Sequence, residues 1–119
     1  MVDTEQGTEH RHALLPDGVI GIETADVLAE RLKMLSDPSR LRMLYSLAEV
    51  GELRVGDLAA TVGSSESATS HQLRQMRLGG LVRARKRGRE VFYRIADTHV
   101  RQLLEVIAEH FLHGDPEHR

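Results

Sequence analysis

Two short helical segments joined by a glycine turn most constrain what this chain can fold into. Residues 55–62 and 65–78 carry apolar side chains at helical spacing, with Gly63 between them. Two short helices joined by a glycine-containing turn of this length are typical of a helix-turn-helix. Residues 81–86 and 90–95 then alternate at period two around Arg87-Gly88-Arg89, which predicts a β-hairpin with a basic tip. A hairpin directly behind a helix-turn-helix is a wing.

Further helices are expected on both sides of this unit. Thr24 is the expected cap of a helix that stops before Asp37-Pro38, and Asp37 caps a second helix that ends at Gly51. Asp97 begins a last helix, which ends before the glycine and proline of residues 114–116. The predicted fold class is mainly α with a β-hairpin, a winged helix-turn-helix.

Composition limits the chain to one domain with an aliphatic core. The 119 residues include no Trp or Cys and only 3% aromatic residues, which favours packed helices and excludes disulfides and thiolate metal sites. Residues 1–18 are polar and end at a proline and a glycine, which predicts a flexible tail before one domain over residues 19–119. The chain has neither an apolar leader nor a long apolar run, so we expect a cytoplasmic protein without a membrane partner.

The net charge of −2 conceals a strong separation of charge along the chain. Residues 71–94 hold eight basic side chains and one acidic side chain, so the other residues carry a balance of −9. A run in which one sign is almost excluded over 24 residues indicates a surface that faces phosphates rather than an ordinary solvated face.

The second helix of the helix-turn-helix presents one polar face. Ser67, Ser70, His71 and Arg74 recur at helical spacing, and the small hydroxyls allow close approach to DNA while His71 and Arg74 add reach. This face therefore predicts a recognition helix in a major groove.

The hairpin tip carries two further basic residues. Arg87 and Arg89 flank Gly88 and are expected to reach phosphate or a narrow minor groove.

The last helix carries two separate pairs of metal-ligand side chains. Asp97 and His99 stand at its start, and His110 and His113 stand at its end. His99 and His110 are about 16 Å apart along the axis, so one helix cannot close a site. Two antiparallel copies across a two-fold axis would form two Asp/His₃ sites, which suit zinc. Alternatively, Asp97 is an ordinary cap and the two later histidines favour the dipole of the helix end. Spacing leaves both interpretations open.

Over roughly residues 24–113 the chain resembles the ArsR/SmtB family of metal-sensing repressors. The segments that carry the resemblance are Leu35–Arg42 (LSDPSRLR), Glu52–Ala59 (ELRVGDLA), Ser67–Arg74 (SATSHQLR) and Gly88–Tyr93 (GREVFY). The resemblance implies a homodimer, formed through the N- and C-terminal helices, that binds an operator with its recognition helix and wing. It also implies that metal binding lowers DNA affinity.

The resemblance selects one metal site and removes another. Asp97, His99, His110 and His113 match the Asp-x-His-x₁₀-His-x₂-His pattern of the terminal-helix subgroup. A second family site needs a cysteine where this chain has Arg54, so that thiolate site is absent. Imidazole and carboxylate donors leave zinc, cobalt or nickel, and four ligands suit zinc. Similarity to the nickel/cobalt sensors suggests extra ligands, for which His10, His12 and His118 are the candidates.

The function expected from these residues is metal-responsive repression. The metal-free homodimer binds a palindromic operator and Zn(II), or Co(II) or Ni(II), releases it, with His71 and Gln72 as candidate links between the two sites. One alternative is a winged-helix repressor that responds to a non-metal signal. A small metal hydrolase is disfavoured, because the pattern lacks a general base beside an open coordination position.

Overall fold

The computed structural model describes residues 14–15, 18 and 20–113, and the chain divides into two units, residues 1–32 and 33–119. In the described part of the first unit, α2 (Ile22–Leu32) buries none of its residues and exposes Val27, Leu28 and Leu32. The expected start at Thr24 was wrong by two residues, because Thr24 lies inside this helix. The predicted boundary between a tail and a domain at residue 18 stays a prediction.

Helix α3 (Pro38–Val50) begins and ends as the sequence predicts. It follows η2 (Lys33–Ser36), a short 3₁₀ helix. The Arg40 amide donates to Asp37 Oδ2 at 2.9 Å, and Pro38 occupies the first turn, where its missing N–H costs nothing. Gly51 ends the helix at a φ of 107°, a value that L side chains rarely adopt.

The helix-turn-helix consists of α4 (Val55–Val62) and α5 (Glu66–Leu78). Gly63 stands between them in the left-handed conformation, which favours glycine. Ser65 then caps α5, since its Oγ accepts from the Ala68 amide at 3.0 Å. Both predicted helices and the tight turn between them are confirmed.

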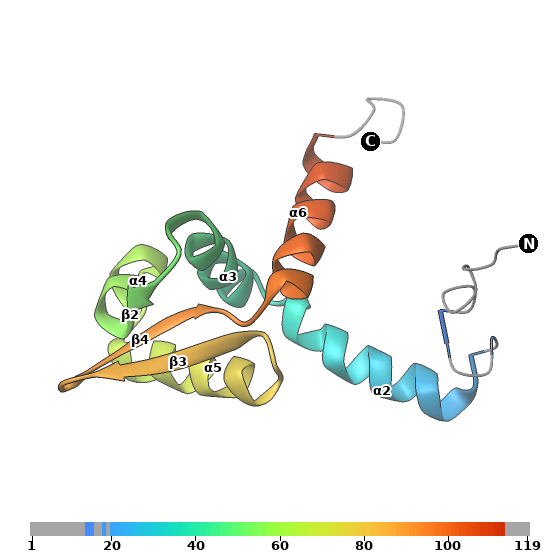
Figure 1. The fold of residues 1–119 in the computed structure, drawn as a ribbon, viewed down its shortest axis with the longest axis horizontal. Helices are drawn as coiled ribbons and strands as arrows, with labels where there is room; N and C mark the ends of the chain where they lie inside the picture. The colour runs from blue at the N-terminus through green and yellow to red at the C-terminus, as the bar shows by residue number, and fades with distance from the viewer. Residues whose placement is uncertain (1–13, 16–17, 19, 114–119) are drawn as a thin grey trace, which may run out of the picture. The chain divides into compact units, whose positions relative to one another are not determined.

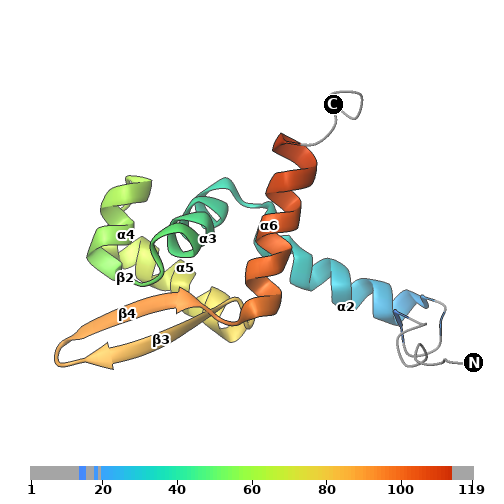
Figure 2. The ribbon, with the colours of Figure 1, turned by 45° about the horizontal axis from the view of Figure 1, so that its top comes forward.

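The wing is an antiparallel sheet of three strands in the order β2-β4-β3, of which the sequence predicted two. Strands β3 (Val82–Arg87) and β4 (Glu90–Ile95) pair from Val82 opposite Ile95 to Arg87 opposite Glu90. The turn is therefore Gly88-Arg89, and Arg87 belongs to the strand rather than to the turn. The additional strand β2 (Leu53–Arg54) pairs with β4. Figures 1 and 2 show the hairpin extending away from the helices, with its turn at the far end.

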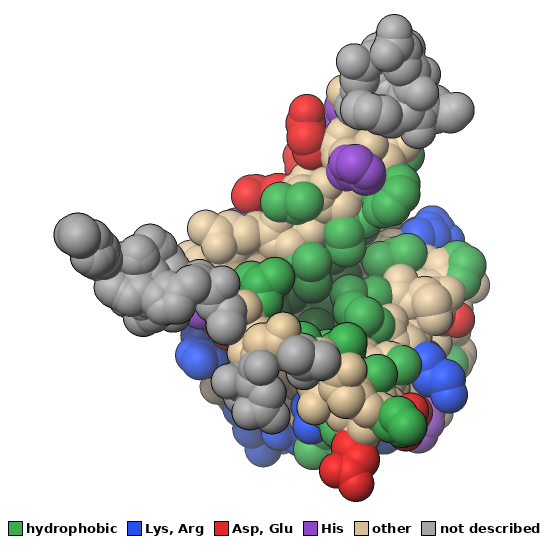
Figure 3. All heavy atoms as spheres, turned by 90° about the vertical axis from the view of Figure 1, so that its right-hand side faces the viewer, with side chains coloured by type: hydrophobic (Ala, Val, Ile, Leu, Met, Phe, Trp, Pro, Cys, Tyr) green, Lys and Arg blue, Asp and Glu red, His purple; other side chains and the backbone are tan. Residues whose placement is uncertain are grey.

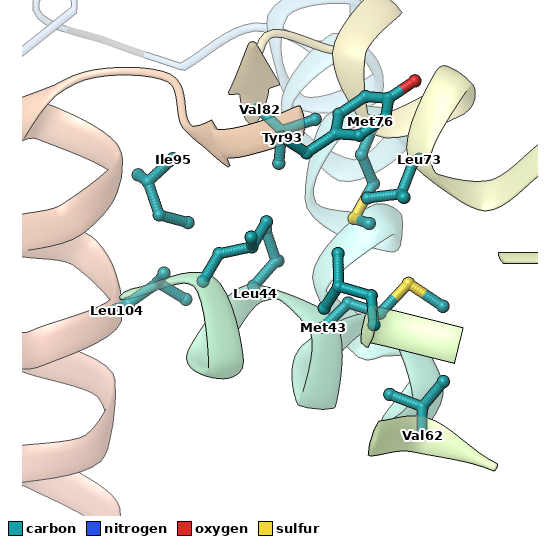
Figure 4. Close-up of a cluster of buried hydrophobic side chains, with 11 residues drawn as sticks. Met43, Leu44, Val62, Leu73, Met76, Val82, Tyr93, Ile95 and Leu104 are labelled. Carbon is teal, nitrogen blue, oxygen red and sulfur yellow. The ribbon is translucent and has the colours of Figure 1, made fainter. Parts of the chain in front are cut away.

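An aliphatic core holds the second unit together (Figure 4). Tyr93 is the one aromatic residue in the cluster, as the composition predicts. The buried members described are Met43, Leu44, Leu47, Leu58, Val62, Leu73, Met76, Val82, Tyr93, Ile95 and Leu104. Because these side chains come from α3, α4, α5, both long strands and α6, one core positions the recognition helix and the wing together.

The last helix, α6 (Thr98–Leu112), is anchored near its middle and leaves the core in its second half. Asp97 Oδ1 accepts from the Val100 amide at 3.0 Å, which confirms the predicted cap. Leu104 is the one buried residue of α6. Across the described residues, no helix is both long and apolar enough to cross a membrane.

Candidate DNA-binding surface and metal-binding helix

The core contacts of α5 determine which of its faces is free. Thr69, Leu73 and Met76 are fully buried, so the helix has one orientation on the core. Ser67, His71 and Arg74 are exposed on the other side, and Ser70 is half-buried. Arg74 Nη1 donates to Ser70 Oγ at 2.9 Å, which places these two side chains on one face as predicted. Thr69 rather than its neighbour Ala68 belongs to the buried face, because Ala68 is exposed.

An open groove joins the start of α5 to the wing. It has a volume of about 700 Å³ and brings Ser67 and Ser70 of α5 together with Arg89 of the turn. Two of the predicted recognition-helix residues and one predicted wing residue therefore line one surface. The lining also contains Arg54 and the carboxylates of Asp57, Glu66 and Glu90, so the groups in it that are suited to contact with DNA are the two hydroxyls and the guanidinium of Arg89.

Arg54 ties the wing to the helix-turn-helix at one wall of this groove. Its Nη1 donates to Glu90 Oε2 at 2.7 Å, and its Nε donates to Asp57 Oδ2 at 3.2 Å. Each of these carboxylates would otherwise repel a phosphate in the groove. The i,i+3 spacing of Arg54 and Asp57 is visible in the sequence, whereas the contact with Glu90 depends on the sheet.

A second ion pair joins strand β3 of the wing to Glu52, which directly precedes β2. Arg85 donates two hydrogen bonds to Glu52, at 3.0 and 2.7 Å. These bonds, and the charges of Arg85 and its arginine neighbours, hold the pKa of the Glu52 carboxyl below its usual range. The guanidinium of Arg85 also lies 5.6 Å from the ring centre of Phe92, in cation–π range.

The two predicted tip arginines have different surroundings. Arg87 lies 5.9 Å from the ring centre of Phe92 and pairs with Glu90 in the strand register. Arg89 stands in the turn and lines the groove. Both are exposed, so both are accessible to a nucleic acid.

The candidate link residues His71 and Gln72 stand on α5, and a hydrogen bond joins Gln72 to α3. Gln72 Oε1 accepts from Ser39 Oγ at 3.4 Å, whereas His71 is exposed. Helix α6 is also bonded to α3, because Tyr45 Oη donates to the Leu104 carbonyl at 2.6 Å. Arg101 Nη1 donates to the Ala48 carbonyl at 3.0 Å. The hydrogen bonds described make α3 the element that both helices share.

All four predicted metal ligands are exposed: His99 and His110 lie on α6, Asp97 caps its start and His113 stands at its end. Asp97 Oδ1 is used by the cap, and the His110 ring meets Phe111 edge-on with ring centres 4.9 Å apart. Among the residues with assigned positions, no three His, Cys, Asp or Glu side chains lie close enough together to hold a metal ion. The two pairs are about 16 Å apart along one helix, so a site that uses both still requires a second copy of α6. The candidate extra ligands His10, His12 and His118 lie outside the described residues.

Three of these ligands share one face of α6 with two exposed apolar residues. His99, Leu103, Val106, His110 and His113 follow one another at alternating steps of four and three residues, which places them in one stripe of a helix. Leu103 and Val106 are 39% and 63% exposed. Figure 3 shows apolar side chains next to a histidine on the helix that leads to the C-terminus. We call these five residues the α6 stripe.

Comparison with known proteins gives consistent matches. Residues 37–84 match the profile of the bacterial regulatory protein, arsR family. The chain is 46% identical to the transcriptional repressor SmtB homolog of Synechocystis over 82% of this chain and 73% of the relative. It is 41% identical to the HTH-type transcriptional regulator NmtR of Mycobacterium tuberculosis over 90% of this chain and 87% of the relative. The homodimeric winged helix-turn-helix DNA-binding domain of Mb0332 from Mycobacterium bovis superposes with a TM-score of 0.67 at 32% identity, covering 80% of this chain and 94% of that one.

Proposed function

The chain belongs to the ArsR family of bacterial regulatory proteins, which are transcriptional regulators rather than enzymes, and on this basis we propose that it is a metal-responsive repressor. The metal-free homodimer binds a palindromic operator and releases it when Zn(II), or alternatively Co(II) or Ni(II), occupies donors on paired α6 helices. Because its target is DNA, we assign it to the cytoplasm.

Contact with DNA is assigned to the exposed face of α5 and the wing turn. Ser67, Ser70, His71 and Arg74 face the major groove, while Arg87 and Arg89 reach phosphates or the minor groove beside it. The shared groove of Ser67, Ser70 and Arg89 supports this assignment. In a dimer, two such surfaces contact two half-sites about one helical turn apart, so the operator is palindromic.

The α6 stripe is the observation that carries the metal assignment. The midpoint between Leu103 and Val106 along the helix coincides with the midpoint between His99 and His110. A two-fold axis through that midpoint sets Leu103 of each protomer against Val106 of its partner. The same axis brings the His99 end of one helix beside the His110 end of the other. One antiparallel pairing therefore buries the exposed apolar residues and completes both halves of the ligand set.

The donor chemistry favours zinc. Asp97, His99, His110 and His113 supply one carboxylate and three imidazoles per site, a set that suits tetrahedral zinc. These residues would hold the metal between the two helices, at both ends of their contact. Nickel prefers more than four ligands, and His10, His12 and His118 are the candidates to supply them. Neutral imidazoles are required, so acidification weakens the response.

Coupling between the two sites is reciprocal. If occupation of the α6 donors weakens operator binding, operator binding must weaken metal affinity by the same factor. The Ser39–Gln72 and Tyr45–Leu104 hydrogen bonds support a route through α3. His71 and Gln72 on α5 stand at the DNA end of this route.

The test measures operator release by zinc in the parent protein and in His110→Ala. Fluorescence anisotropy on a duplex selected from a random library should show zinc-induced release of the parent only. Glu105→Gln, an exposed change on α6 outside the stripe, should respond as the parent does. If zinc releases the parent no better than His110→Ala, the protein is not a sensor of this kind. If zinc does release the parent, the intensity of the absorption spectrum of the cobalt-loaded protein distinguishes a four-coordinate metal site from a six-coordinate one.

A second candidate is a winged-helix repressor that senses a non-metal signal. The bond from Asp97 to the Val100 amide favours it, because a cap alone explains that aspartate. Stoichiometric zinc titration separates the two candidates, since the second one predicts no site with a Kd tighter than about 1 μM.

A further inference from the structure

A pocket at the base of the wing gathers three arginines from three elements. Arg77 comes from the end of α5, Arg83 from β3 and Arg94 from β4, and they line a space of about 470 Å³. Asp97, just before α6, is the one carboxylate in the lining, and its Oδ1 is already used by the Val100 amide. The side chains of this pocket therefore carry a balance of two positive charges.

The strand register sets two of these arginines directly against each other. Arg83 and Arg94 are cross-strand partners, and like charges in this position destabilise a sheet. Neither forms an ion pair with any described residue. The charge of Arg94 helps to lower the pKa of Glu52 without contact between the two side chains. The carboxylate of Glu52 is bonded to Arg85 instead.

Two other arginines of the same sheet are neutralised, whereas Arg87 lies over the ring of Phe92. Arg85 has Glu52, and Arg54 has Asp57 and Glu90. The sheet thus supplies carboxylates for two arginines and none for the facing pair of Arg83 and Arg94. A local arrangement that opposes stability is typical of a functional site, and the missing partner here is an anion.

The position of Arg77 indicates which anion. Arg77 follows Arg74 by three residues and Ser70 by seven, so it continues the exposed face of α5. Clustered guanidinium groups bind phosphate oxygens with charge-assisted hydrogen bonds. We propose that Arg77, Arg83 and Arg94 hold a backbone phosphate of bound DNA, an inference that rests on the proposed DNA-binding function. The contact surface then extends from the wing turn to the wing base.

This site has a measurable signature in the salt dependence of binding. Each phosphate neutralised contributes about −0.9 to the slope of log affinity against log salt concentration. Arg83→Gln and Arg94→Gln should each weaken binding several-fold and make the slope shallower by about one. Arg31→Gln on α2 removes the same charge at an exposed position outside the pocket and should leave the slope unchanged.

Anisotropy titrations of metal-free protein between about 50 and 200 mM salt test this expectation. They use a duplex selected from a random library and a scrambled duplex, because phosphate contacts do not depend on sequence. If Arg83→Gln and Arg94→Gln retain the parent slope on both duplexes, the pocket assignment is overturned. If the parent does not prefer the selected duplex, the proposed function fails, while the slopes on the scrambled duplex still decide the pocket.

Two controls separate this role from others. Each substitution removes one of two facing like charges, so thermal unfolding should show no decrease in the Tm of either variant. If the two arginines had a structural role, the Tm of both variants would be lower. Titration of the DNA-free protein with inorganic phosphate, followed at the Gly80 and Ala96 amides by NMR, detects a free-anion site. Saturation of those signals at low phosphate combined with unchanged DNA slopes would overturn the assignment to DNA.

Discussion

Helices α5 and α6 are both capped amphipathic helices, but only α5 is complete within one chain. Helix α5 buries Thr69, Leu73 and Met76, and its polar face is left free as a single surface. Helix α6 buries Leu104 alone and leaves Val106 and Phe111 63% and 69% exposed. The packing of α5 therefore determines which face is free for the proposed contact with DNA. The exposed apolar residues of α6 instead indicate that a second surface covers them.

The difference extends to the chemistry of the two helices. The groove at α5 already combines side chains from helix and wing in one protomer. The ligands on α6 form no group of three in the described part of one protomer. The proposed DNA contacts can thus be located on a single chain, while the proposed metal site needs a pair of chains.

The largest effect is expected from a charge placed in the α6 stripe. Val106→Glu sets a carboxylate at the centre of the proposed helix pair, where an unpaired buried charge costs about 3–5 kcal/mol. Sedimentation velocity should show a monomer, and operator binding should weaken with it. Val50→Glu is the matched control, because Val50 on α3 is also 63% exposed. A dimer that survives Val106→Glu would place the interface elsewhere.

A smaller effect is expected from a substitution on the buried face of α5. The resulting loss of unfolding free energy should not depend on protein concentration. Leu73→Ala should lower the free energy of unfolding by about 3 kcal/mol, because Leu73 is fully buried and leaves a cavity. Urea unfolding at two protein concentrations measures this loss. Ser67→Ala, on the exposed face, should change stability by less than about 0.5 kcal/mol. Equal losses in the two variants would contradict the assigned faces of α5.

The smallest effect concerns the ion pair that supports the wing. The pKa of Glu52 is lowered in the folded protein by Arg85, so at acidic pH the unfolded chain binds the proton more readily. The pair therefore stabilises the fold at neutral pH, and this contribution is lost as the pH falls through the lowered pKa. Urea unfolding across the acidic range should show a weaker pH dependence in Glu52→Gln than in the parent. The effect is small because both partners are accessible to solvent and salt.

Glu49→Gln is the control for that pH series. It removes an exposed carboxylate of α3 for which the described residues provide no ion pair. A parent-like pH dependence in Glu52→Gln would show that this ion pair does not contribute to stability.

Elements with local signals were predictable, and those without were missed. Asp37, Pro38 and Gly63 act through their own backbone preferences and neighbouring amides, so their roles follow from the sequence. Strand β2 has two residues, too few for any periodicity, and it exists because Leu53 and Arg54 meet β4. Helix α2 starts before Thr24 because a capping residue is also tolerated inside a helix.

The candidate site divides in the same way. The exposed face of α5 was predictable, because helical periodicity alone separates Ser67 and Arg74 from Leu73. The Arg54–Glu90 ion pair and the arginine pocket were not, because residues far apart in sequence meet there only through the sheet.

By itself, the sequence determined most of the helix ends, the hairpin, the polarity of each helix and the family, since these depend on nearest neighbours and periodicity. Only the tertiary structure decided which charges meet. The register of β3 and β4 sets Arg83 against Arg94 while Arg85 reaches Glu52. It also decided that Leu103 and Val106 remain uncovered in one chain. Charge pairing and exposure depend on distances through space, which no local pattern along the chain encodes.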